Sequence, residues 1–142
     1  MLDRPTIRRD VVASGPLPAD EVWDRYVRPR RWPEWSPQIR SVDYPADRLS
    51  PRTAGVVHGP FGLRVAFRIL DVDELGPERS WSWSVSAIGV PLILRHTVMA
   101  IPAGTRTGLT VEGFAPVVLG YLPVARSALH RLVGPRSPHA RT

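Results

Sequence analysis

The sequence predicts an α+β fold in which a curved antiparallel sheet of about seven strands packs against a long C-terminal helix. Three observations predict it. One strand and two short helical segments come first, alternating apolar segments separated by turn residues then fill residues 39–114, and helical spacing returns after residue 114. An antiparallel sheet with one apolar face cannot bury that face alone, so the final helix is expected to lie across it.

The first two elements follow from composition and spacing. Residues 6–14, TIRRDVVAS, combine β-branched and charged residues before GPLP, which predicts a strand and a turn. The next segment, ADEVWDRYVR at 19–28, has acidic residues at its start and apolar residues at helical spacing. It is therefore expected to be a helix, and Pro29 is expected to end it.

The stretch RRWPEWSP, residues 30–37, is expected to form a single helical turn. Pro33 suits the first helical position, while Pro37 prevents extension. Trp32 and Trp35 are three positions apart and therefore share one face of that turn.

Six strands are expected to follow. The separators between them are rich in Gly, Pro and Ser, as in hairpin turns. The clearest alternation places Trp81, Trp83, Val85 and Ala87 on one face and serines on the other. The expected strands are 39–44 (IRSVDY), 54–59 (AGVVHG), 63–75 (LRVAFRILDVDEL), 79–87 (RSWSWSVSA), 91–101 (PLILRHTVMAI) and 106–114 (RTGLTVEGF).

The last element is predicted from an apolar stripe over residues 115–134. Its members recur at steps of three and four residues: Val118, Leu122, Ala125, Leu129 and Leu132. Pro123 is expected to kink the helix or to begin a second piece of it. Residues 1–134 are expected to form one domain, and residues 135–142 a disordered tail.

Composition excludes several kinds of chemistry. The chain has no cysteine, which rules out disulfides, thiolate metal sites and cysteine nucleophiles. All 19 basic residues are arginine, so a lysine Schiff base and the phosphate-binding loop that needs lysine are also excluded. The four histidines lack metal-binding spacing, and neither a metal nor a cofactor is expected. No apolar run approaches the length of a membrane span, and a cytoplasmic location is expected.

Two longer pieces carry a resemblance to a known family. The order of elements, together with ADEVWDRYVRPRRWPEWSP and GTRTGLTVEGFAPVVLGYLP, resembles the polyketide cyclase/dehydrase family of the START-like (SRPBCC, helix-grip) superfamily over residues 6–133. The resemblance implies a sheet that grips the long helix and an elongated apolar cavity between them. It further implies a hydrophobic small-molecule ligand, handled by a cyclase or dehydratase or by a non-catalytic carrier or sensor.

The implied cavity suggests roles for particular side chains. Trp32 and Trp35 are expected to close its mouth and to offer indole N–H groups to a ligand, or else to plug the end of the core. His96, in an apolar strand, is the candidate general acid or base, although it also suits a core histidine held by internal hydrogen bonds. The strand faces and the helix stripe are expected to supply Phe67, Trp81, Trp83, Leu122, Ala125 and Leu129.

Further polar candidates stand beside these positions. His58 lies near a turn, and Glu112 is expected to reach the cavity only if a bulge at Gly113 re-aims it. Tyr121 can present its hydroxyl to a ligand, or keep its tip in water, and Arg126 is the arginine best placed to bind a carboxylate.

Nucleic acid is the rival partner considered. Four arginines precede or flank Trp32 and Trp35, namely Arg25, Arg28, Arg30 and Arg31. Basic residues near aromatic residues are typical of single-strand binders. The other arginines are spread among acidic residues, so nucleic acid is not expected as a partner. The sequence leaves both a monomer and a homodimer open.

Overall fold

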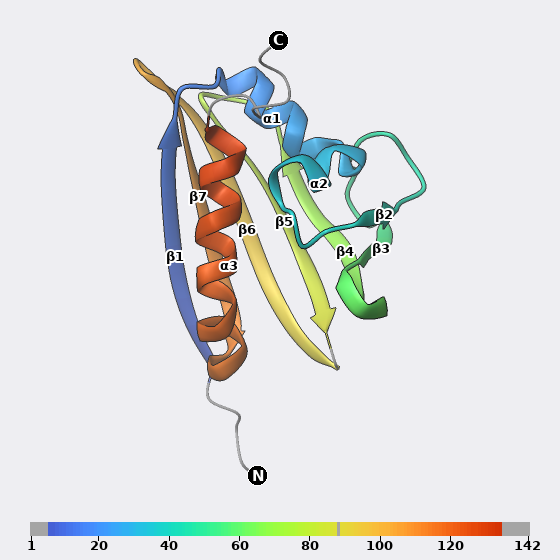
Figure 1. The fold of residues 1–142 in the computed structure, drawn as a ribbon. Helices are drawn as coiled ribbons and strands as arrows, with labels where there is room; N and C mark the ends of the chain where they lie inside the picture. Colours follow the sequence, from blue (N-terminus) through green and yellow to red (C-terminus); the bar gives the residue numbers. More distant parts are fainter. Residues whose placement is uncertain (1–5, 88, 135–142) are drawn as a thin grey trace.

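The computed structural model of the chain describes residues 6–87 and 89–134, so the tail expected at 135–142 lies outside the described residues. A seven-stranded antiparallel sheet curves around one long helix (Figure 1). The strands are β1 (Thr6–Gly15), β2 (Ser41–Asp43), β3 (Ala54–His58), β4 (Arg64–Asp73), β5 (Glu78–Ala87), β6 (Val90–Ile101) and β7 (Gly104–Phe114). The helices are α1 (Ala19–Val27), α2 (Trp32–Trp35) and α3 (Ala115–Val133), with short 3₁₀ turns η1 (Pro29–Arg31) and η2 (Pro60–Gly62).

The strands lie in the order β1-β7-β6-β5-β4-β3-β2. Consecutive strands from β2 to β7 are neighbours, which follows from the short turns between them. The exception is β1, which pairs with β7 over its whole length. The chain then crosses the concave side through α1 and α2 and reaches the opposite edge at β2. The predicted α+β helix-grip fold is therefore confirmed.

The apolar faces occur where the alternation predicts them. Trp81, Trp83 and Val85 of β5 are buried on the concave side, where α3 covers part of the sheet. In β4, Phe67 and Ile69 are buried likewise. A bulge between Ile69 and Asp71 then shifts the register with β5, which ends the regular alternation of this strand.

The second helical piece that Pro123 could begin is not observed, because α3 runs as one helix from Ala115 to Val133 with Pro123 inside it. A proline lacks the N–H that would bond the carbonyl four residues earlier. Here that carbonyl belongs to Leu119, and both Leu119 and Pro123 are exposed, where water can take the place of the missing donor.

Candidate functional site

The short helix α2 is held by the end of α1. The last carbonyls of a helix have no partner inside the helix. Trp32 donates its indole N–H to the Tyr26 carbonyl at 2.8 Å, and Trp35 donates its own to the Arg25 carbonyl at 3.2 Å. Both indole N–H groups therefore cap α1, and they are not available to a ligand as the sequence had suggested.

Fixing α2 in this way places Trp32 at the centre of an aromatic cluster. Its ring stacks on Trp81 with centroids 5.8 Å apart and meets Trp83 edge-on at 5.1 Å. Trp81 in turn stacks on the imidazole of His96, with centroids 4.4 Å apart and planes at 8°. These rings come from α2, β5 and β6, so the cluster ties the short helix to the sheet.

A cavity of about 350 Å³ lies between this cluster, the concave face of the sheet and α3. The size is within the range of small-molecule sites. Strands β3 to β7 supply one wall and α3 supplies another. Two connecting segments complete it with Ser36, Gln38, Ile39, Gly59, Pro60 and Leu63. The rim is marked by two wall residues that are also exposed, Leu63 and Val124.

The wall formed by the described residues contains no Asp, Glu or Arg side chain. A charged ligand group would therefore enter without a counter-ion, which is costly in an apolar interior. The polar side chains in the wall are Ser36, Gln38, His96 and Tyr121, in addition to the indoles.

The hydrogen bonds of His96 fix its protonation. Thr107 donates its hydroxyl to the Thr97 carbonyl at 2.8 Å, since a carbonyl can only accept. The Tyr26 hydroxyl, 2.9 Å from Thr107 Oγ1, must then donate to Thr107. Nδ1 of His96, 3.1 Å from the Tyr26 oxygen, must therefore carry the proton. Nε2 accepts the indole N–H of Trp83 at 3.0 Å.

This arrangement holds His96 in a single neutral tautomer. Burial lowers the pKa of His96 to about 3, because the charged imidazolium would lose its hydration. Both ring nitrogens are occupied, so neither can exchange a proton with a ligand while these bonds last. The geometry corresponds to the core-histidine alternative and gives no support to acid/base catalysis by His96.

Tyr121 differs from His96, because its hydroxyl makes no hydrogen bond to any residue that the structure describes. The side chain projects from α3 into the cavity wall. Burial raises the pKa of Tyr121 to about 12. The phenol therefore stays protonated at neutral pH and can donate a hydrogen bond to a ligand oxygen.

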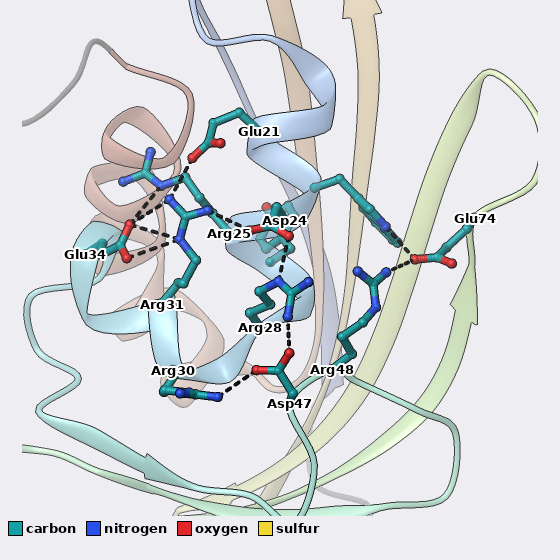
Figure 2. A network of polar contacts seen from close by, with 12 residues as sticks. Glu21, Asp24, Arg25, Arg28, Arg30, Arg31, Glu34, Asp47, Arg48 and Glu74 are labelled. Carbon is teal, nitrogen blue, oxygen red and sulfur yellow. Dashed lines mark hydrogen bonds and ion pairs between the residues drawn. The ribbon is translucent and has the colours of Figure 1, made fainter.

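The arginines around α1 and α2 form an internal network, shown in Figure 2. Arg31 contacts Glu21, Asp24 and Glu34 at 2.6 to 3.1 Å. Arg25 donates to the carbonyls of Arg131 and Leu132 at the end of α3, at 3.1 and 2.6 Å. The remaining two are also paired: Arg28 with Asp24 and Asp47, and Arg30 with Asp47.

This network locks α1 and α2 to the C-terminal end of α3. Trp32 is 1% and Trp35 6% exposed, so neither offers a surface on which a nucleic-acid base could stack. The cluster of arginine and tryptophan in the sequence thus has a structural explanation.

The structure brings eight of the thirteen expected site residues together. They line the cavity from α2, β5, β6 and α3: Trp32, Trp35, Trp81, Trp83, His96, Tyr121, Ala125 and Leu129. The other five lie outside its wall. Phe67 and Leu122 are buried in the surrounding core.

The remaining three point away from the cavity. His58 follows the cavity-lining Val57 on β3 and therefore faces the other side of the sheet, where it contacts Asp43 at 2.7 Å. Glu112 is exposed, because β7 keeps a regular register with β6 and no bulge at Gly113 re-aims the side chain. Arg126 is exposed on α3.

Two wall segments were not predicted to lie at the cavity. Residues 36–39 and 59–63 are loops or turns, although Ile39, Gly59 and Leu63 were expected at strand ends, and only the fold brings these segments beside α3. Other wall residues could have been predicted, because side chains two positions apart on a strand share one face of the sheet. Leu94 lies two positions before His96 on β6, and Leu109 pairs with His96 across the sheet.

The described residues were also compared with what a metal site and a membrane-spanning helix require. Among the described residues, no three His, Asp or Glu side chains are gathered as ligands of a metal ion would be. No helix in that part has the length and hydropathy needed to cross a bilayer.

Comparison with known proteins identifies the family. A family model described as polyketide cyclase / dehydrase and lipid transport matches residues 7–134. The chain belongs to this family. The resemblance to the polyketide cyclase/dehydrase family noted from the sequence is thus confirmed.

Solved structures share the fold of this family member at low identity. A hypothetical protein, jhp0584 from Helicobacter pylori, has a TM-score of 0.72 at 13% identity and covers 92% of this chain and 86% of its own. Ara h 8.0201 has a TM-score of 0.66 at 14% identity, and the match covers 90% of this chain and 98% of Ara h 8.0201. Protein Ms6760 from Mycobacterium smegmatis has a TM-score of 0.64 at 20% identity, and the match covers 88% of this chain and 87% of Ms6760. No curated protein matches the chain.

Proposed function

We propose that this polyketide cyclase/dehydrase family member binds an uncharged, mainly apolar small molecule and holds it unchanged. Membership in the family supports a hydrophobic ligand-binding fold. The observation that carries the proposal is the cavity of about 350 Å³, whose described wall lacks charged side chains. A neutral ligand loses little hydration there, whereas an anion or a cation would stay unpaired.

The free polar groups of the wall add one requirement on the ligand. Internal hydrogen bonds already use the ring N–H groups of four wall residues: Trp32, Trp35, Trp83 and His96. The side chains of Ser36, Gln38 and Tyr121 make no hydrogen bond to any described residue, and the raised pKa of Tyr121 keeps its hydroxyl protonated. The indole N–H of Trp81 also lacks a partner among these residues, but it is fully buried. The ligand that fits best is therefore a ring or chain system with an oxygen acceptor, such as a ketone, within reach of Tyr121.

An enzyme of the cyclase or dehydratase type is the second candidate, and the family description favours it. Enolisation and dehydration need a group that takes up a proton and one that supplies it. In the described wall, Tyr121 can supply a proton to a carbonyl, but His96 has no free nitrogen to accept one. Recovery of a chemically changed ligand after incubation would select this alternative.

The first test compares two ligands that differ only in an oxygen. Titration calorimetry with fluorene and 9-fluorenone is expected to give tighter binding of the ketone, by about fivefold, the worth of one neutral hydrogen bond. Tyr121→Phe is expected to remove this advantage and to leave the affinity for fluorene unchanged. Native mass spectrometry of freshly purified protein checks in parallel for a bound neutral molecule.

Tyr44→Phe is the matched control. This change also removes a phenol, but the Tyr44 hydroxyl contacts Thr53 outside the cavity. Equal affinities of the wild type for both ligands would refute the role of Tyr121. Failure of both ligands to bind would count against the cavity function itself.

A further inference from the structure

The turn between β3 and β4 presents an aromatic side chain to solvent. Phe61 of η2 has a relative exposure of 103%, the highest of the large apolar residues described. Its backbone has φ 59°, in the left-handed region that bulky residues rarely adopt. The molecule thus carries backbone strain at a fully exposed phenylalanine, and strained residues cluster at functional sites.

This turn is part of the cavity mouth. Pro60 and Leu63, on either side of Phe61, both line the cavity, and Leu63 is 45% exposed. Val124 of α3 also lines the cavity and is 38% exposed. Figure 1 shows η2 near the edge of the sheet, toward the end at which α3 begins. An apolar surface therefore runs from the inside of the cavity to the Phe61 tip.

Unpaired positive charges flank the tip. Arg64 directly follows Leu63, and the backbone N–H of Arg40 donates to the His58 carbonyl at 2.8 Å, just before the turn. Both arginines are exposed, and neither forms an ion pair with any described residue. The nearby Asp43 is already paired with His58. The arginines of α1 and η1, by contrast, are used internally.

We propose that Phe61 and Leu63, with Arg40 and Arg64, dock the cavity mouth on a lipid bilayer that carries anionic headgroups. An exposed aromatic side chain beside cationic residues matches the interface of such a bilayer, with the ring among the acyl chains and the guanidinium groups at the headgroups. Apolar ligands dissolve poorly in water, so a cavity whose opening lies at the bilayer can exchange them with the membrane directly, without passage through water.

The size of the surface favours a bilayer over a protein partner. A stable protein interface buries about 800 Å² on each side and needs a broad complementary face. The tip consists of a single turn with two exposed apolar side chains, which falls short of such a face. A bilayer can accept one protruding ring without any matching surface.

Flotation with vesicles tests the proposal. The 142-residue chain is expected to float with vesicles of phosphatidylcholine containing phosphatidylglycerol, and to bind much less to phosphatidylcholine alone. Phe61→Ser is expected to weaken binding about tenfold, because one ring no longer leaves water. Replacing Arg40 and Arg64 by Gln is expected to weaken it about fivefold for each charge.

Leu75→Ser is the matched control. Leu75 is 84% exposed in the turn between β4 and β5, at the opposite end of the sheet, so its loss is expected to leave vesicle binding unchanged. Thermal melting checks that Phe61→Ser remains folded, as an exposed residue should allow.

Three results would overturn the proposal. The first is that the wild type does not float with vesicles, and the second is that Phe61→Ser floats as well as the wild type. The third is that the wild type does not bind vesicles but forms a dimer in light scattering, and that Phe61→Ser abolishes this dimer. Phe61 does not line the cavity, so the affinity of the same variant for 9-fluorenone tests the ligand site separately.

Discussion

Acidification from pH 7 to pH 4 is expected to destabilise the wild-type protein by roughly 2 to 3 kcal/mol more than a His96→Gln variant. The native pKa of His96 is about 3, against 6.5 for the ordinary side chain. Between these values the unfolded chain binds a proton that the native state excludes. Stability contributed by the neutral imidazole is therefore complete above pH 6.5 and declines as the pH falls toward 3.

Glutamine is the informative replacement. Its amide can donate to Tyr26 through the nitrogen and accept from Trp83 through the oxygen, as His96 does at Nδ1 and Nε2. It has no titration in this range. Urea unfolding at pH 7, 6, 5 and 4 measures the two stabilities, and carboxylates common to both proteins cancel in the difference. Parallel curves would mean that His96 is protonated in the native state or reachable by solvent.

The strands and the final helix could be predicted because their signals are local. Alternation in β5 and the three-and-four spacing in α3 depend only on which side of one element faces the core. The seven strands and three helices were accordingly found with boundaries close to those observed. The sequence left open whether Pro123 begins a second piece of helix, because that depends on exposure at Leu119, which spacing does not report.

The chemistry of the site was harder, because it depends on pairs that are distant in the sequence. His96 and Tyr26 are 70 positions apart, and Tyr26 and Thr107 are 81 apart. No property of the β6 segment alone tells whether both imidazole nitrogens are occupied. The roles of Trp32 and Trp35 likewise depend on the carbonyls at the end of α1, and the two wall loops depend on the curvature of the sheet.

Filling the cavity from α3 is expected to weaken ligand binding without loss of stability. Ala125 is fully buried and lines the cavity, so the ring of an Ala125→Phe variant extends into the open space. Binding 9-fluorenone beside the new ring would overpack the site at a cost of about 1 to 3 kcal/mol, which corresponds to about a 5- to 150-fold loss of affinity. The melting temperature is expected to stay level or rise, because the added ring gains contacts in a void.

Arg126→Phe places the same ring one position further along α3, where the side chain is exposed. This variant is expected to bind 9-fluorenone as the wild type does. The pair therefore separates occupation of the cavity from a general effect of aromatic substitution on the helix. Wild-type affinity in Ala125→Phe would place the ligand elsewhere on the protein, and a sharp fall in its melting temperature would show that the space beside Ala125 is too small for a ring. Loss of binding with melting preserved is the result that an apolar ligand site between the sheet and α3 requires.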